Sequence, residues 1–493
     1  MSGSRETHSD SKAATIALFF MAMVGVALIF LFPGSPEQDS GYHFLMARAS
    51  WQDPVFLVKV WARPFFTALF AGPVLLGWTF ARFFAVAIGL CVAWQNWLLA
   101  KDLRMDRAWL VIPLLLGQPV FFELYSDLLT EPLFALIFVV ALRWHLRGWV
   151  IRGILAASLL PLARPEGFFV GILWGAWILA RVWSKAGSEK SSFLAVVKAI
   201  PATLLLATGV IAWWAAAWVI TGDPLFIKND WPPQWVQGTY GNGTLFSYAG
   251  RSLEIAGLFL LIPFLVGFVT HFRNRLDWNW LCVISPVLLI FGLHTVFWAY
   301  GLFGSAGFPR YMVCVAPSLA VITLDGCNTL FTMAVQRLRW SRTTARILGA
   351  TVLATSITLS FVYLDGLSWS RDAVAIAEMD KWLEKNPRTV KRFIWSHAHM
   401  CVLTDRSIQE KPMFTADKMV NLKLLRDSAP GTLVVWDDQL GPDWVGLTAA
   451  DIETAGYQLL RTRDYVLPGV LLQGRIDGHN FTRRIQVSAL YKP

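Results

Sequence analysis

The sequence predicts a polytopic α-helical membrane protein of about 11 transmembrane helices, with a small C-terminal α/β domain outside the membrane. Composition predicts the membrane class: of the 493 residues, 55% are hydrophobic and only 15% are charged, whereas soluble domains carry about a quarter charged residues. The mean hydropathy is +0.50. The 25 Trp and 34 Phe residues suit broad membrane interfaces, where aromatic rings collect. The same composition excludes disordered, collagen-like and coiled-coil proteins.

Long apolar runs define the expected spans. The first run, residues 13–32, is long enough to cross a bilayer. A polar loop containing Pro33, Pro36 and Asp39 follows it, instead of a small-residue cleavage site, so we expect an uncleaved helix after a cytoplasmic tail, residues 1–12. The stretch 64–77 is expected to be re-entrant or to lie on the surface. Further spans are expected at 78–99, 108–123, 130–147, 151–163, 165–183, 199–220, 253–270, 278–298, 311–333 and 346–364.

Lys and Arg set the expected orientation, because the cytoplasmic loops of membrane proteins are rich in both. With the N-terminus inside, 16 of these residues fall in inner loops and seven in outer loops. This bias accounts for the net charge of +10 without a nucleic-acid partner. An odd number of spans places the C-terminus outside. No retention signal ends the chain, so we expect a multi-pass protein of a bacterial inner membrane, with a periplasmic C-terminal domain.

The last expected domain, residues 365–493, follows a transmembrane domain at 13–364 and has an ordinary soluble composition. Its pattern predicts a helix at 370–384, strands at 390–395 and 433–436, and a helix at 448–455 with Thr448 as its N-cap. The domain contains no GxGxxG, Walker A or HExxH motif, so we expect no chemistry of its own there.

Ionisable and polar residues that are energetically unfavourable near a membrane cluster on the expected outer side of the transmembrane domain. Ionisable residues in or beside spans are expensive, and they therefore mark candidate functional sites. Several have a structural explanation when taken singly: Thr130-Glu131-Pro132 and Arg164-Pro165-Glu166 look like helix starts, and His294 suits a satisfied interior histidine. The candidate site residues are Asp39, Tyr42, His43, Arg63, Arg82, Glu131, Arg164, Glu166, His294, Arg310 and Tyr311.

Asp39 differs from the other acids, because no helix is expected over residues 36–41 for it to cap. A single carboxylate at a membrane surface is what a general base requires when an acceptor hydroxyl must lose a proton. Arg310 stands at the head of a span after a glycine-rich stretch, residues 301–307, and suits a phosphate at headgroup depth; Arg63, Arg82 and Arg251 are lesser candidates. This set favours group transfer from a phosphate-bearing lipid over hydrolysis through a covalent intermediate.

These motifs together resemble a known superfamily. An Asp in the first outer loop followed by Tyr42-His43, the two helix starts, and Pro309-Arg310-Tyr311 resemble the GT-C glycosyltransferases, which use polyprenyl-phosphate sugars, and most of all their mannosyltransferase-like branch. The resemblance covers residues 13–364 and implies an inverting transferase with Asp39 as the catalytic base. It implies a polyprenyl-phosphate-sugar donor, carrying mannose or a similar hexose or pentose, and a glycan, lipid or protein acceptor.

The resemblance has one departure. Many members have a second acid next to the first, whereas residue 40 is Ser here. No metal site is therefore expected, and a role for a divalent cation is left open.

Three alternatives remain at this stage. A lipid-linked glycan ligase would share the topology and differ in its donor. A multi-span transporter would show an internal repeat and broken helices near the middle of the membrane, and the sequence contains no such repeat. A non-catalytic receptor would leave the clustered outer charges unexplained.

Overall fold

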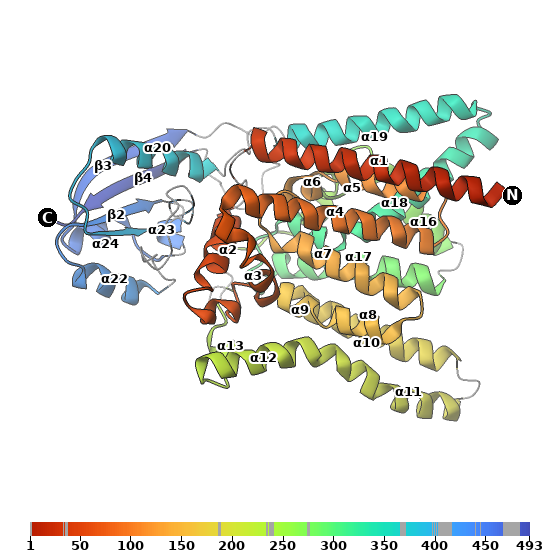
Figure 1. Cartoon of the computed structure of the whole chain (residues 1–493), viewed down its shortest axis with the longest axis horizontal. Helices are drawn as coiled ribbons and strands as arrows, with labels where there is room; N and C mark the ends of the chain where they lie inside the picture. Colours follow the sequence, from red (N-terminus) through yellow and green to blue (C-terminus); the bar gives the residue numbers. More distant parts are fainter. Residues whose placement is uncertain are drawn as a thin grey trace.

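A bundle of long helices with a small sheet domain beyond one end is the architecture of the computed structural model (Figure 1). The N-terminus lies at the end of the bundle away from that domain, and the C-terminus lies within it. The structure describes residues 2–32, 34, 38–185, 189–232, 235, 241–273, 277–364, 371–396, 398, 400, 402, 417–438, 440–443, 445–466 and 484–493.

The bundle combines long helices with short connecting ones. The longer helices are α1 (Ser2–Leu31), α4 (Trp78–Asp102), α7 (Thr130–Leu146), α10 (Glu166–Lys185), α11 (Glu189–Leu204), α12 (Thr208–Thr221), α16 (Leu261–Arg273), α17 (Trp278–Ala299), α18 (Ala316–Gln336) and α19 (Arg342–Leu364). The shorter ones are α2 (Gln38–Ala49), η1 (Pro54–Leu57), α3 (Pro64–Phe70), η2 (Pro73–Leu76), η3 (Ala108–Leu110), α5 (Val111–Leu116), α6 (Pro119–Leu124), α8 (Val150–Ala157), α9 (Leu160–Ala163), η4 (Leu205–Ala207), α13 (Phe226–Asn229), α14 (Ser247–Gly250), α15 (Ser252–Ala256) and η6 (Pro309–Val315).

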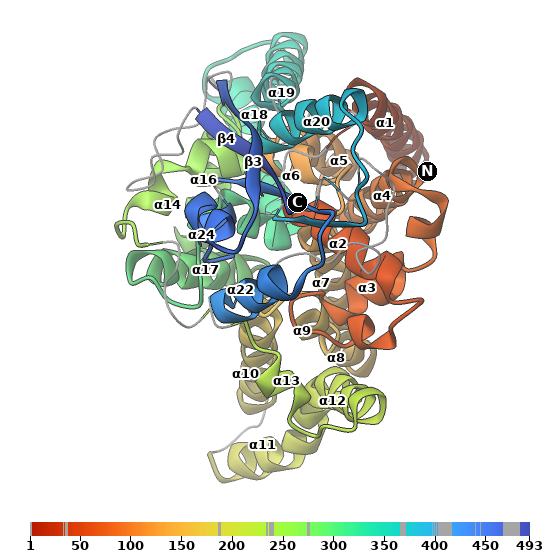
Figure 2. The same ribbon diagram turned by 90° about the vertical axis from the view of Figure 1, so that its left-hand side faces the viewer.

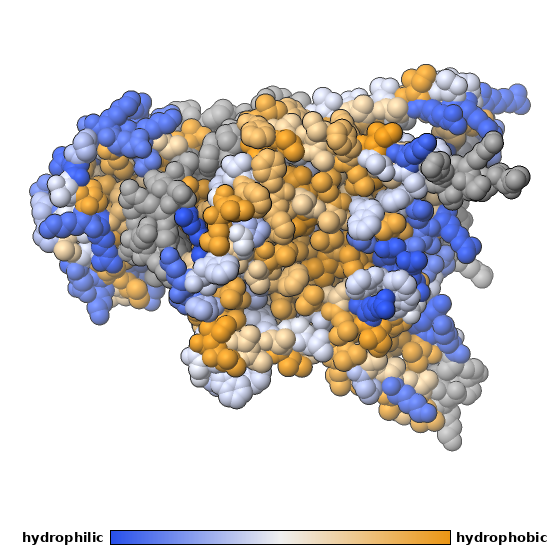
Figure 3. All heavy atoms as spheres, in the orientation of Figure 1, coloured by the Kyte–Doolittle hydropathy of each residue, from blue (hydrophilic) through white to orange (hydrophobic). Residues whose placement is uncertain are grey.

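Apolar side chains cover the middle of the bundle on the face seen in Figure 3, between hydrophilic ends. Seven helical stretches of the described residues are long and apolar enough to cross a membrane. The chain is therefore an integral multi-pass membrane protein, as predicted. The expected count of 11 spans is not confirmed. The seven stretches are Ser9–Leu31, Trp78–Asp102, Glu166–Lys185, Phe193–Thr221, Trp278–Ala299, Pro309–Gln336 and Arg342–Phe361.

Local backbone chemistry breaks some of the expected spans into short helices. The stretch 108–123 forms η3, α5 and α6 in succession. Gln118 is extended (φ −89°, ψ 109°) and Pro119 begins α6, because a residue before proline disfavours the helical region and proline suits a first turn. The stretch 151–163 likewise divides into α8 and α9, and 253–270 into α15 and α16.

Two glycines bring α16 and α18 into backbone contact. A Cβ atom at Gly326 would lie 1.7 Å from the carbonyl oxygen of Pro263, and one at Gly267 would lie 2.1 Å from that of Ile322. No side chain fits at either distance, so the contact requires glycine at both positions.

Helices α11 and α12 run along one edge of the bundle (Figures 1 and 2). Only 6% of the most apolar window in Phe193–Thr221 is buried, so most of this arm faces lipid. The arm is nevertheless tied to the segment before α3. Trp213 Nε1 donates to the Val58 carbonyl at 2.8 Å. Asp230, just after α13, accepts from Lys59 Nζ at 3.1 Å and from the Val60 amide at 2.8 Å.

The C-terminal domain is a four-stranded mixed sheet with helices, as the sequence predicts in outline. Strands β1 and β2 are parallel, β4 is antiparallel to both β2 and β3, and the order is β1-β2-β4-β3. Thr448 caps α24 as predicted: its Oγ1 accepts from the Asp451 amide at 3.2 Å. The elements are α20 (Arg371–Lys385), β1 (Arg392–Trp395), α22 (Lys418–Asp427), β2 (Thr432–Asp437), α23 (Leu440–Asp443), α24 (Ala449–Thr454), β3 (Gln458–Val466) and β4 (Arg484–Tyr491).

The domain packs on the end of the bundle, with α2 and α3 behind it in Figure 2. The main hydrophobic cluster continues from the bundle into the domain, where it includes Ile376, Trp395 and Val487. A second, smaller cluster around Val434 and Leu490 lies within the domain itself. The domain boundaries at 1–12, 13–364 and 365–493 remain predictions.

Candidate active site

The candidate site forms where several helices begin at the end of the bundle that faces the C-terminal domain. Both predicted helix starts are confirmed: α7 begins at Thr130 and α10 at Glu166. Each carries an acid, Glu131 or Glu166, in its first turn, where the helix dipole stabilises negative charge. The two starts therefore place two carboxylates at the same end of the bundle.

The expectation of a helix-free stretch around Asp39 is wrong. Helix α2 begins at Gln38, and Asp39 lies in its first turn. An acid is favoured at that position, so the placement of Asp39 has a structural explanation as well as a chemical one. The helix also fixes the direction of the carboxylate, which a loose loop would not do.

A chain of buried ion pairs connects the helix starts. Arg164 Nη1 lies 2.6 Å from Glu131 Oε1, and its Nη2 lies 2.8 Å from Glu166 Oε1. The Glu131 side chain is fully buried, and its Oε1 also lies 3.5 Å from Arg310 Nε. His294 Nε2 lies 3.3 Å from Glu166 Oε1. Buried charges require such mutual pairing, because each alone would carry a large desolvation cost.

Asp39 ends this chain on its accessible side. Arg310 Nη2 donates to Asp39 Oδ2, and the Asp39 side chain is 33% exposed while that of Arg310 is 8% exposed. Burial acts against the charged form of Asp39, but the charge and hydrogen bond of Arg310, together with the charge of Arg164, hold the pKa of this carboxyl below its ordinary 3.8. Asp39 is therefore an ionised carboxylate that a second molecule can reach.

His43 lies one helical turn after Asp39 and is neutral at physiological pH. Burial lowers its pKa to about 3, although Asp39 acts in the opposite direction. Its ring stacks on Trp61 with 4.9 Å between ring centroids and an interplanar angle of 18°. Its Nδ1 atom is buried without a hydrogen-bond partner among the described residues. A buried unpartnered nitrogen is costly, so this atom is available to a bound ligand.

Unlike Arg164 and Arg310, Arg63 has no carboxylate within 4.0 Å among the described residues. Its guanidinium lies 4.6 Å from the ring centroid of Trp235, and its Nη1 reaches the Val60 carbonyl only at 3.5 Å. Burial lowers the pKa of Arg63 to about 10, and the charge of Arg164 acts in the same direction. The site thus holds a guanidinium whose charge is incompletely compensated.

The backbone of Arg63 is strained. Its φ of 60° and ψ of 89° place it in the left-handed region, where a non-glycine residue costs on the order of 1–3 kcal/mol. Such strain persists only where the surrounding structure fixes it, and it concentrates at ligand sites. Pro64, which begins α3, helps to fix the conformation here.

Three further predicted residues have different surroundings. Tyr311 belongs to the cluster: its ring lies 4.4 Å from that of His294 and 5.1 Å from the Arg164 guanidinium. Tyr42 instead faces the C-terminal domain, where its hydroxyl donates to the Ser396 carbonyl at 3.1 Å. Arg82 donates to the carbonyls of Ser126 and Phe32, so its donors are engaged by backbone outside the ion-pair chain.

Sequence reasoning missed the aromatic partners of the site. Trp61 and Trp235 stack on His43 and Arg63. Their positions were a usable signal, because both tryptophans lie in segments that the sequence places outside the membrane. A Trp beside an Arg is a common cation–π arrangement, but the sequence alone does not tell it from an interfacial tryptophan.

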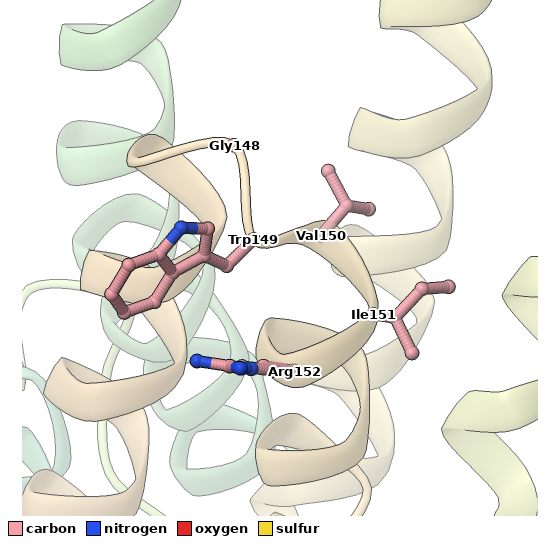
Figure 4. Close-up of a pocket in the computed structure, with 5 residues that line it drawn as sticks. All are labelled: Gly148, Trp149, Val150, Ile151 and Arg152. Atoms are coloured by element: carbon pink, nitrogen blue, oxygen red, sulfur yellow. The ribbon is translucent and has the colours of Figure 1, made fainter.

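No metal site is evident in the described part of the chain, where no three His, Cys, Asp or Glu residues lie together in a way that could hold an ion. A shallow surface pocket of about 380 Å³ lies in the connection between α7 and α8. Figure 4 shows Trp149 and Arg152 side by side there. Since α7 runs some 25 Å from Glu131 to this connection, the pocket is remote from the ion-pair chain.

Comparison with known proteins gives the fold. No family model and no curated protein sequence match the chain. The crystal structure of ArnT from Cupriavidus metallidurans bound to undecaprenyl phosphate is similar over 96% of this chain and 97% of that one, with a TM-score of 0.58 and 12% sequence identity. The chain has the GT-C fold. The predicted resemblance is thereby confirmed for the fold.

A second structure agrees with the GT-C assignment. The archaeal oligosaccharyltransferase AglB from Archaeoglobus fulgidus, in complex with an inhibitory peptide and a dolichol-phosphate, is similar over 90% of this chain and 72% of that one. The TM-score is 0.52 and the identity 12%. At such identities the likeness establishes the GT-C fold alone, and the roles of the individual site residues remain predictions.

Proposed function

We propose that the chain is a membrane-embedded inverting glycosyltransferase that moves a sugar from a polyprenyl-phosphate donor to an acceptor hydroxyl. The observation that carries the proposal is the presence, within one GT-C fold, of an accessible ionised carboxylate, Asp39, and of a partly buried arginine, Arg63, that has no carboxylate within 4.0 Å among the described residues. The two solved GT-C structures contain undecaprenyl phosphate and dolichol-phosphate respectively, which supports a lipid of that class here.

In the proposed reaction, the acceptor oxygen attacks the anomeric carbon of the donor sugar. A bond forms between that oxygen and the carbon, and the bond from the carbon to the phosphate oxygen breaks. The acceptor proton passes to Asp39, and the electron pair leaves with the polyprenyl phosphate. Arg63 and Arg310 stabilise the charge on the departing phosphate in a partly dry site, where fixed cations act more strongly than in water.

The ion pair between Asp39 and Arg310 has a chemical consequence. Before the donor binds, Asp39 is a weak base, because its ion pair with an arginine depresses its pKa. A phosphate that binds between Arg63 and Arg310 shares the positive charge now directed at Asp39, and it adds a negative charge nearby. Both effects raise the pKa of Asp39, so the base strengthens when the donor is in place.

The charge of the site favours a monophosphate donor over a diphosphate. Arg164 and Arg310 are each engaged by carboxylates, and the donors of Arg82 are engaged by backbone carbonyls. Arg63 is therefore the cation that we assign to the phosphate. A polyprenyl-phosphate sugar is a phosphodiester with one negative charge, whereas a lipid diphosphate carries more. The likeness to AglB keeps glycan ligation as the second candidate. We propose mannose or a similar hexose or pentose as the sugar, and a bacterial inner membrane with the site on the periplasmic side.

Binding of the lipid product tests this proposal without knowledge of the sugar. Purified protein in detergent is titrated with undecaprenyl phosphate, undecaprenyl diphosphate and phosphatidylcholine, and binding is followed by native mass spectrometry. We expect the monophosphate to bind best. Preference for the diphosphate would favour the ligase, and no preference for either over phosphatidylcholine would overturn the proposed function. A positive result is followed by transfer of labelled sugar from matched donors in liposomes.

A further inference from the structure

Three neighbouring positions at the start of α2 bind three different parts of the chain. Asp39 pairs with Arg310 of η6. Ser40 Oγ donates to Asp127 Oδ2, just before α7, at 2.8 Å. Tyr42 donates from its hydroxyl to the Ser396 carbonyl in the C-terminal domain at 3.1 Å. The helix that carries the proposed base is thus held partly by a domain that contributes no group to the ion-pair chain.

Ser396 is itself firmly held. It follows β1, and its amide donates to the Val435 carbonyl of β2 at 3.3 Å. Its hydroxyl donates to Asp437 Oδ2, and the Asp437 amide donates back to the same hydroxyl at 3.2 Å. Both residues are buried, with 2% and 0% exposure. Because β1 and β2 are parallel, their carboxyl ends meet at one edge of the sheet, and that edge contacts α2 through Tyr42.

We infer that Tyr42 is a positioning residue, through which the C-terminal domain fixes the helix that carries Asp39. The inference rests on the proposed function for its catalytic consequence. Tyr42 lies almost one turn after Asp39, so movement of this side chain moves the carboxylate relative to Arg310 and the substrate. A displacement of about one ångström at a reacting group is enough to reduce turnover severely.

The hydroxyl can be removed without disturbing the ring. Tyr42 packs edge-to-face on Trp61, with 5.4 Å between centroids, and Tyr42→Phe keeps this contact. The chain offers a matched control in Tyr491 of β4, whose hydroxyl donates to the Thr389 carbonyl at 3.3 Å. That hydrogen bond has the same chemistry and lies within the C-terminal domain, without contact to α2.

The expected result for Tyr42→Phe is a three- to tenfold fall in kcat with little change in donor KM, the fold-change that corresponds to one net hydrogen bond. Amide hydrogen exchange should rise in α2. Tyr491→Phe should change neither. Ser396→Ala removes the hydroxyl that orders the accepting carbonyl. In the double variant with Tyr42→Phe, kcat should therefore fall by less than the product of the two single falls.

Two outcomes would overturn the inference. One is unchanged exchange in α2 of Tyr42→Phe, and the other is an equal response of Tyr491→Phe. The exchange measurement requires no substrate. If the native protein transfers no sugar from any polyprenyl-phosphate donor, the proposed function fails, while exchange in α2 still decides whether the C-terminal domain holds this helix.

Discussion

Arg63 is the residue at which the charge argument is most directly testable. In Arg63→Gln the side chain keeps a hydrogen-bond donor but loses its charge, so only the electrostatic attraction to a phosphate is removed. The direct Coulomb interaction of two unit charges about 4 Å apart is about 4 kcal/mol at an effective dielectric constant near 20. Desolvation reduces it, and hydrogen bonds to charged groups contribute about 1.5–3 kcal/mol net.

This range converts to a loss of about 10- to 150-fold in affinity for undecaprenyl phosphate. Arg63→Lys keeps the charge but loses the planar fork, so it should lie between the native protein and Arg63→Gln. The matched control is Lys59→Gln in the same segment. Lys59 is a partly buried cation whose charge is already paired, with Asp230 at 3.1 Å. Because the neighbouring carboxylate offsets its attraction for a phosphate, its replacement should leave affinity within about twofold.

The assay is titration with undecaprenyl phosphate at two salt concentrations, by native mass spectrometry and by displacement of a fluorescent lipid. The native protein should lose affinity as salt rises, and Arg63→Gln should be less sensitive to salt. If Arg63→Gln binds within twofold of the native protein, or if Lys59→Gln loses as much, Arg63 does not hold the phosphate. The proposed preference for a monophosphate donor would then lack its cation.

The remaining predictions concern the base, the buried histidine and the helix contact. Asp39→Asn should bind undecaprenyl phosphate but turn over about 10²- to 10⁴-fold more slowly in a labelled-sugar transfer assay; a native rate would exclude Asp39 as the base. Because the pKa of His43 falls to about 3 from 6.5 in the unfolded chain, stability is complete above pH 6.5 and declines as the pH falls toward 3, by up to about 1.4 kcal/mol per pH unit. His43→Gln should therefore flatten the dependence of the thermal midpoint on pH between 6.5 and 4, and an unchanged slope would contradict the burial of a neutral ring. Gly326→Ala places a Cβ 1.7 Å from a backbone oxygen and should lower the thermal midpoint by the equivalent of about 1–3 kcal/mol or more, whereas Gly349→Ala, with no atom within 4 Å, should be neutral.

Local signals explain which parts of the fold could be predicted. The starts of α7 and α10 are encoded by a proline and an acid at adjacent positions, and the cap of α24 by Thr448 and Asp451, so each depends on a few neighbouring residues. The start of α2 also has a proline and acids nearby, in Pro36, Glu37 and Asp39. Ser40 and Gly41, which follow, are poor helix formers and argue against a helix there. Tertiary contacts fix it instead, among them the bond from Ser40 to Asp127.

The site was predictable as a set of residues but not as a set of pairs. Charged groups on one side of a membrane can be collected from sequence, since each carries a cost that marks it. Which arginine meets which carboxylate depends on how the helix starts converge. Arg310 was the expected phosphate ligand, yet it faces Asp39 and Glu131, and the spare charge lies on Arg63.

Because the arm formed by α11 and α12 faces lipid, we expect donor binding at the site to depend on bilayer thickness. A helix adapts to a thinner or thicker membrane by tilting, and the part of α12 near the site is bonded, through Trp213, to the Val58 carbonyl. The Asp230 carboxylate beyond it holds the Val60 amide, three residues before Arg63. We therefore expect a change of tilt to reach the strained backbone at Arg63, so donor affinities should be compared in membranes of defined lipid chain length.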